Sequence, residues 1–119
     1  MTDENRVFPD ARPSPWGFLE ITPADLQAQR GKVLIIDVRE PPEYTGELGH
    51  VAGSQLVPLS GWPAAAASLD RSKPMVCVCR SGKRSAQAAA HLIQSGAREV
   101  YNLMGGMMGW ADHKLPVER

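Results

Sequence analysis

The sequence MVCVC at residues 75–79 runs into RSGKRS at residues 80–85 and AQAAAHLIQSG at residues 86–96. The first five residues are continuously apolar, which is typical of a strand buried on both faces. Alanines and Ile93 then recur at helical spacing, and Gly96 suits the end of a helix. This stretch therefore predicts a buried strand, a short polar loop and a helix in direct succession.

The rest of the chain repeats this alternation. VLIIDV at residues 33–38 predicts a second buried strand. Ahead of that strand, Thr22 and Pro23 predict the start of a helix, which should end near Gly31. Weaker strand signals cover residues 55–57 and 99–103, and short helices are expected over residues 62–69 and near the C-terminus. Strands that alternate with helices predict an α/β domain with a mainly parallel sheet. We assign it to residues 18–119, after an irregular or partly disordered proline-containing arm over residues 1–17.

Composition excludes several classes of protein. The chain has 119 residues, of which 43% are hydrophobic, and 13 basic residues balance 13 acidic ones. This content fits one globular domain rather than a disordered chain. No apolar stretch is long enough to cross a membrane, no signal peptide is recognisable, and zero net charge argues against a nucleic-acid or membrane partner. We therefore expect a cytoplasmic protein.

The loop that follows the strand at residues 75–79 carries the clearest chemical signal. It begins at Cys79 and ends at Arg84, at the carboxyl end of a strand and the start of a helix, where α/β proteins bind ligands. Helix-end amides and the basic residues Arg80, Lys83 and Arg84 favour an anion, and a thiolate is such an anion. Cys79 is therefore a candidate nucleophile. We interpret Cys77, between Val76 and Val78, as a structural residue, and two cysteines alone suggest neither a disulfide nor a metal site.

At this point the sequence resembles the rhodanese family of single-domain sulfurtransferases. The resemblance spans about residues 20–117 and is carried by several motifs in order: ITPADL at 21–26, IDVREPPEY at 36–44, GHVAGS at 49–54, CRSGKRSAQAA at 79–89 and VYNLMGGMMGW at 100–110. It implies a three-layer α/β domain with a central five-stranded, mainly parallel sheet flanked by helices on both faces. Cys79 would be the catalytic nucleophile, at the head of a cradle loop that binds substrate through Arg80, Ser81, Gly82, Lys83 and Arg84.

The resemblance also implies a reaction. Cys79 would take the sulfane sulfur of a donor such as thiosulfate, become a persulfide, and pass that sulfur to cyanide or a thiol. The partners would be a small-molecule donor and acceptor, with a sulfur-relay protein as a further option. No metal or organic cofactor is needed for this chemistry.

Three alternatives remain open at this stage. Phosphatases and arsenate reductases of related fold need an arginine six positions after the cysteine, whereas Ser85 stands there and Arg84 comes one residue early. A non-catalytic rhodanese-like binding module usually lacks the cysteine. A persulfide carrier that delivers sulfur to a partner protein would use the same Cys79 chemistry, so the sequence does not separate it from a thiosulfate-using enzyme.

Other polar residues are assigned supporting roles. Asp37, Arg39 and Glu43 follow a buried strand, and we expect them to brace loops beside the cradle through carboxylate–guanidinium hydrogen bonds. His50 is expected to order its loop, because an ionised thiol needs no general base. Met107 and Met108 are expected to pack in the core, with the mouth of the pocket as the alternative.

Overall fold

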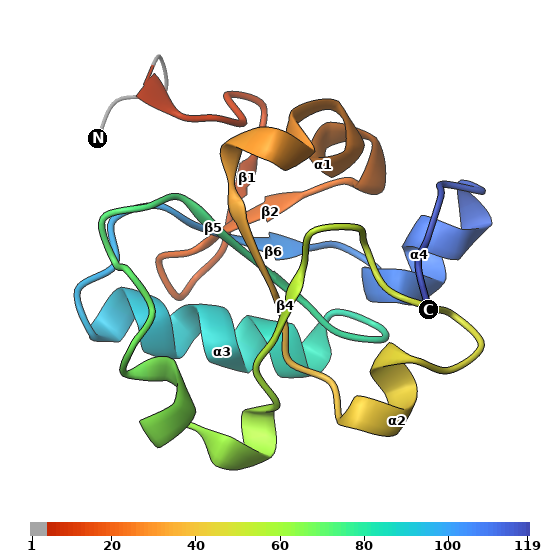
Figure 1. Ribbon diagram of the computed structural model, residues 1–119. Helices are drawn as coiled ribbons and strands as arrows, with labels where there is room; N and C mark the ends of the chain where they lie inside the picture. The colour runs from red at the N-terminus through yellow and green to blue at the C-terminus, as the bar shows by residue number, and fades with distance from the viewer. Residues whose placement is uncertain (1–4) are drawn as a thin grey trace.

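The computed structural model describes residues 5–119, and it is organised around one sheet (Figure 1). The sheet has six strands in the order β1-β2-β6-β5-β3-β4, and all neighbouring strands are parallel except β1 and β2. The strands are β1 (Arg12–Pro13), β2 (Leu19–Ile21), β3 (Leu34–Asp37), β4 (Gln55–Leu56), β5 (Met75–Val78) and β6 (Val100–Leu103). The α/β class and the mainly parallel sheet are confirmed.

The predicted strand count of five is one too low. The additional pairing is made by the proline-containing arm, because Arg12 lies opposite Glu20 and Pro13 lies opposite Leu19. Nearer the N-terminus of the arm, Phe8 is only 3% exposed, and its ring contacts that of Tyr101 edge to face, with 4.8 Å between ring centroids. Phe8 thus packs against the sheet, and Arg12–Pro13 extend it by one strand. The placement of a domain boundary at residue 17 stays a prediction.

Helices cover both faces of the sheet, as predicted (Figure 1). The α-helices are α1 (Pro23–Gln29), α2 (Pro41–Tyr44), α3 (Lys83–Gln94) and α4 (Gly106–Asp112), and the 3₁₀ turns are η2 (Arg30–Lys32), η3 (Leu59–Gly61) and η4 (Ala64–Ala66). Thr22 caps α1 as expected: its hydroxyl accepts the amide of Asp25, and the Asp25 carboxylate accepts the amide of Thr22. The α-helix expected over residues 62–69 is instead one short 3₁₀ turn, η4, which follows Pro63, because the amides of Ala66 and Ala67 bond to carbonyls three residues back.

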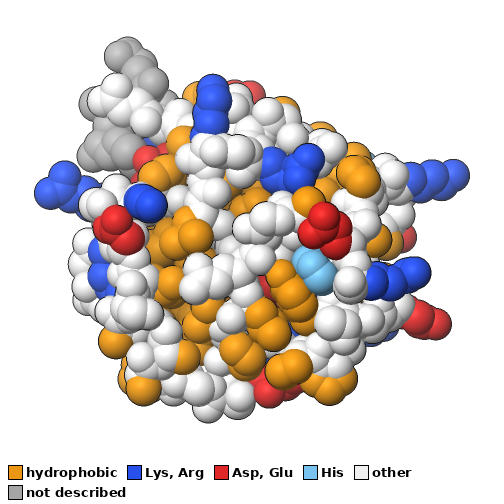
Figure 2. Space-filling view, in the orientation of Figure 1, with side chains coloured by type: hydrophobic (Ala, Val, Ile, Leu, Met, Phe, Trp, Pro, Cys, Tyr) orange, Lys and Arg blue, Asp and Glu red, His pale blue; other side chains and the backbone are white. Residues whose placement is uncertain are grey.

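The central strands are buried on both faces, which explains their continuous apolar runs. Along β5, Met75 and Cys77 face a core shared with α3, whereas Val76 and Val78 face a second core that contains Leu26 of α1 and Trp110 of α4. Figure 2 shows the face of the molecule seen in Figure 1, with hydrophobic side chains in its middle and charged ones mainly around its rim. Since both faces of the sheet are occupied by helices, the carboxyl ends of the strands are left as the place for a site.

Within residues 5–119, no helix is both long and apolar enough to cross a membrane. In the same part of the chain, no group of three or more His, Cys, Asp or Glu side chains could hold a metal ion.

Candidate active site

The cradle begins where β5 ends. Cys79 follows Val78 directly, is 1% exposed, and is held at the junction because its carbonyl accepts the amide of Met107 at 2.8 Å. Gly82 stands just before α3 with φ of 103°, a left-handed conformation that favours glycine. That turn directs the backbone around the sulfur, and the Gly82 amide donates a hydrogen bond to Cys79 Sγ at 3.0 Å.

Hydrogen bonds determine the acidity of Cys79. Burial has the largest single effect and raises the pKa of the thiol. Hydrogen bonds from the Ser85 hydroxyl and from the backbone amides of Ser85, Gly82 and Ser81 lower it. Together these hydrogen bonds outweigh burial, so the pKa of Cys79 lies below that of an ordinary cysteine. The Ser85 hydroxyl lies 3.3 Å from Cys79 Sγ. Nearby Cys77 behaves oppositely, because complete burial and then the neighbouring Cys79 charge raise its pKa. The cradle therefore favours the thiolate at Cys79 alone.

The three basic residues of the cradle are not equivalent. The Arg84 guanidinium donates two hydrogen bonds to the Glu43 carboxylate, at 2.7 and 2.8 Å, so much of its charge is neutralised. The hydrogen bond to Glu43 raises the pKa of Arg84 more than attraction from the Cys79 thiolate does. Arg80 and Lys83 are not buried, and neither forms an ion pair with any of residues 5–119. Arg80 and Lys83 are therefore the cations that remain accessible to an incoming anion.

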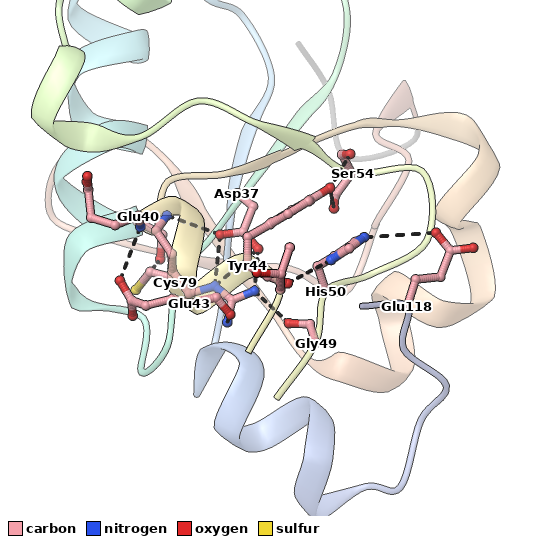
Figure 3. Close-up of polar contacts among 12 residues, drawn as sticks. Asp37, Glu40, Glu43, Tyr44, Gly49, His50, Ser54, Cys79 and Glu118 are labelled. Atoms are coloured by element: carbon pink, nitrogen blue, oxygen red, sulfur yellow. Dashed lines mark hydrogen bonds and ion pairs between the residues drawn. The ribbon is translucent and has the colours of Figure 1, made fainter. Parts of the chain in front are cut away.

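Arg39 and Asp37 form a buried ion pair, and Arg39 lines the same hollow as Arg80 of the cradle. Figure 3 shows the polar contacts around Asp37. The Arg39 guanidinium donates to the Asp37 carboxylate, with Nη2 at 2.8 Å from Oδ2, and both side chains are 1% exposed. The same guanidinium donates to the carbonyls of Glu43 at 3.2 Å and Gly49 at 2.7 Å. These contacts tie the end of β3 to α2 and to the following loop.

A hollow of about 290 Å³ lies next to this pair and is bounded by Arg80 of the cradle. Its other lining residues come from the end of β3, α2 and the loop after it: Arg39, Pro42, Glu43, Gly46, Glu47 and Leu48. Within the described part of the chain, neither Met107 nor Met108 lines this hollow. Met107 is fully buried in the core, and Met108 is 44% exposed.

His50 lies away from the sulfur. In Figure 3, Cys79 and Glu43 lie on one side of the group of residues drawn, and His50 and Glu118 on the other. The His50 ring stacks on Tyr44 at 3.7 Å between centroids, and its Nδ1 is 2.8 Å from the Tyr44 carbonyl. These contacts fix the loop between α2 and β4, and they put His50 in no position to exchange a proton with Cys79.

Three residues at the cradle were missed by the sequence reasoning: Ser85, Asn102 and Gly106. Ser85 is completely buried between Cys79 and Asn102 of β6. Gly106 opens α4, and a Cβ there would overlap the carbonyl oxygens of Cys79 and Arg80. The double glycine of GGMMGW was the available signal for Gly106, whereas the role of Asn102 depends on strand order, which no local motif reveals.

Comparisons with known proteins agree with this geometry. The family model of the rhodanese-like domain matches residues 22–113. A sulfurtransferase from Allochromatium vinosum is 38% identical over 85 residues, covering 71% of this chain and 78% of that protein. The thiosulfate sulfurtransferase GlpE of Stutzerimonas stutzeri is 34% identical over 100 residues, covering 83% and 89%. A crystal structure of a rhodanese-related protein from Thermoplasma volcanium matches with a TM-score of 0.76 and 32% identity, covering 82% and 94%.

The chain therefore belongs to the rhodanese-like family, which confirms the family and the fold class expected from the motifs. Its named relatives support sulfur transfer as its general chemistry.

Proposed function

We propose that this protein is a thiosulfate sulfurtransferase that works through a persulfide on Cys79. The single observation that carries the proposal is the cradle around the Cys79 sulfur, which receives hydrogen bonds from the Gly82 amide at 3.0 Å and the Ser85 hydroxyl at 3.3 Å. Such a cradle stabilises a negative sulfur in the resting protein. It would also stabilise the terminal sulfur of a persulfide, because its fixed donors need no rearrangement.

The first step takes sulfur from the donor. The Cys79 thiolate attacks the outer sulfur of thiosulfate, a new sulfur–sulfur bond forms, and the original bond breaks with its electron pair leaving on sulfite. The accessible cations Arg80 and Lys83 would attract the dianionic donor and stabilise the charge on departing sulfite.

The second step delivers the sulfur. Cyanide attacks the terminal sulfur of the persulfide, a carbon–sulfur bond forms, and the Cys79 thiolate leaves with the electron pair of the broken sulfur–sulfur bond. A thiol acceptor would react as its thiolate and leave as a persulfide. The first displacement starts from the Cys79 thiolate and the second regenerates it, and in each step both the attacking and the leaving group are anions. Neither step therefore requires a general base, in agreement with the position of His50.

Mass measurement after incubation with thiosulfate tests the proposal. The intact protein should gain about 32 mass units, one sulfur atom, and cyanide should remove them as thiocyanate. Cys79→Ser should abolish the gain and the transfer of sulfur. Cys77→Ser is the matched control and should retain most activity, since burial raises the pKa of the Cys77 thiol. An inactive Cys77→Ser with an active Cys79→Ser would overturn the site assignment.

The alternatives predict different outcomes. A phosphatase needs a free arginine to surround the phosphate, but Arg84 is held by Glu43, so we expect no Cys79-dependent hydrolysis of p-nitrophenyl phosphate. A folded protein that gains no sulfur from thiosulfate, polysulfide or cysteine persulfide would instead be a binding module. A persulfide that forms but passes its sulfur only to a protein acceptor would identify a carrier.

We also place the protein in the cytoplasm as part of this proposal. Cys77 and Cys79 are both free thiols, and persistent free thiols suit a reducing compartment.

A further inference from the structure

Asn102 is a buried polar side chain that the proposed mechanism does not use. It is 3% exposed and lies near the end of β6, beside the end of β5 where Cys79 begins the cradle. A buried amide is costly unless its donors and acceptor are satisfied, so the direction of its hydrogen bonds carries information.

Both donors of the Asn102 amide are committed. Its Nδ2 donates to the Glu20 carboxylate of β2 at 3.1 Å and to the Gly82 carbonyl of the cradle at 3.1 Å. Both partners can only accept hydrogen bonds. The carbonyl oxygen Oδ1 must therefore face the other way, toward Ser85, and it can only accept from that residue.

Ser85 has one hydroxyl hydrogen and two acceptors for it. Its Oγ lies 2.5 Å from Asn102 Oδ1 and 3.3 Å from Cys79 Sγ. A hydroxyl rotates easily but donates its hydrogen to one acceptor at full strength at a time. Asn102 and the Cys79 sulfur therefore compete for the same hydrogen.

We propose that Asn102 is a positioning residue that acts on Cys79 through Ser85, by competing with the sulfur for the Ser85 hydroxyl hydrogen. When Cys79 is a thiolate, the hydrogen turns to Sγ. When the sulfur carries a proton or a second sulfur atom, its negative charge is gone or moved outward, and the hydrogen turns to Asn102 Oδ1. The part concerning the persulfide rests on the proposed function, whereas the part concerning the thiol does not.

A double-mutant cycle tests the competition. The rate of Cys79 alkylation by iodoacetamide is measured against pH in the Cys77→Ser background, for the parent, Ser85→Ala, Asn102→Leu and the double variant. The alkylation rate below the pKa reports the fraction of thiolate. Leucine has a similar shape but accepts no hydrogen bond, so Asn102→Leu removes the competitor.

The expected result is a coupling between the two positions. In the protein that keeps Ser85, Asn102→Leu should shift the pH profile of alkylation to lower pH, relative to its effect in the Ser85→Ala background. Near pH 6 this relative shift should appear as roughly threefold faster alkylation, which corresponds to the free energy of one modest hydrogen bond. Loss of the bonds to Gly82 and Glu20 affects both backgrounds and cancels. Equal shifts in both backgrounds, or a relative shift to higher pH, would overturn the proposal.

A second measurement does not depend on the buried leucine substitution. The ¹³Cγ chemical shift of Asn102 in the otherwise unmodified protein reports whether its carbonyl accepts a hydrogen bond. It should change as Cys79 titrates, and this change should be absent in Ser85→Ala. An Asn102 shift that is constant through the titration, or that moves equally in Ser85→Ala, would show that no hydrogen moves between the two acceptors.

Discussion

The Glu43 carboxylate binds the Arg84 guanidinium through two hydrogen bonds, at 2.7 and 2.8 Å, and so joins α2 to the last residue of the cradle. The two residues are 41 positions apart in the sequence. A parallel pair of bonds between guanidinium and carboxylate fixes orientation as well as distance. This contact holds one wall of the site in place and limits the positive charge presented to substrate.

Glu43→Gln should strengthen binding of anionic donors. The substitution removes the carboxylate that neutralises Arg84, which adds a free cation near Arg80, the basic residue of the cradle that lines the hollow together with Glu43. For thiosulfate we expect the KM to fall by about threefold, with a steeper dependence on salt, because partly exposed charges interact weakly and are screened. Steady-state kinetics at two ionic strengths measure both. Glu40→Gln, at the N-cap of α2, is the control and should leave the KM unchanged.

The opposite result has a separate meaning. A KM for thiosulfate that rises in Glu43→Gln would show that the Glu43 contact serves mainly to position Arg84, and that the neutralised charge does not weaken donor binding.

The same pair should make stability depend on pH under acidic conditions. The Arg84 hydrogen bond lowers the pKa of Glu43 to about 2 from its ordinary 4.5, against the opposing effect of partial burial. Ionised Glu43 thus stabilises the folded protein fully above pH 4.5, and this contribution is lost as the pH falls toward 2. Because the side chain is 32% exposed, solvent screening limits the contribution to about 1 kcal/mol.

Urea unfolding of the parent and Glu43→Gln measures this contribution. At about pH 6 the free energy of unfolding should be lower in Glu43→Gln by about 1 kcal/mol, and by about pH 3 the difference should narrow by roughly half. A difference that stays constant or widens as the pH falls would contradict the role given to the ionised carboxylate.

Gly106→Ala should disrupt the cradle. Gly106 has φ of 56°, and an added Cβ would overlap the carbonyl oxygens of Cys79 and Arg80. The left-handed backbone alone costs about 1 kcal/mol for alanine, and the overlap adds about 2 kcal/mol or more. We expect a lower melting temperature and at least about tenfold slower sulfur transfer, since a shift of about 1 Å at a reacting group has large effects on rate.

Gly53→Ala is the matched control for that substitution. Gly53 also has a positive φ, 83°, but nothing lies within 4 Å of its added Cβ. It should cost only the backbone strain, about 1 kcal/mol, and leave sulfur transfer near the parent rate. Equal losses of activity in the two variants would mean that backbone strain, and not contact with the cradle, is responsible.

Phe8→Ala should destabilise the whole domain. The Phe8 ring is 3% exposed and meets Tyr101 edge to face, and the neighbouring Val7 amide donates to the Glu99 carboxylate at 2.9 Å. Removing a buried phenylalanine side chain costs about 3 kcal/mol, which urea unfolding detects. Trp16→Ala is the control: this side chain is 63% exposed, and we expect a loss below about 1 kcal/mol. A parent-like Phe8→Ala would mean that the arm contributes little to folding.

The sequence predicted the parts of the fold that are coded locally. The apolar runs at residues 33–38 and 75–79 correspond to β3 and β5, because a strand buried on both faces is apolar along most of its length; in β3 only Asp37, at its end, is charged. In contrast, β2 covers only Leu19–Ile21 and β1 only Arg12–Pro13, so neither is long enough to show a periodic pattern. Both form because a neighbouring strand supplies hydrogen bonds, and that information lies elsewhere in the chain.

The candidate site was predicted to a similar extent. The motif CRSGKRS placed Cys79 and its cradle at the end of a strand, and the structure brings these residues together there. Helix-end amides and three nearby cations were expected to lower the pKa of Cys79. Backbone amides do lower it, but the other contribution comes from the Ser85 hydroxyl and not from the cations. Arg84 is paired with the carboxylate of Glu43, which lies close in space but far away in the sequence, so the cradle motif alone does not reveal the pair.

The antiparallel pairing of β1 with β2 has a consequence for the behaviour of the protein at high concentration. An uncovered β2 would offer its outer row of amides and carbonyls to strands of other molecules, a common start of aggregation. The strand that covers it is two residues long and includes Pro13, which has no amide hydrogen to donate. The sheet therefore terminates at this edge in a strand too short and too poor in donors to recruit another, which protects the molecule against edge-to-edge self-association.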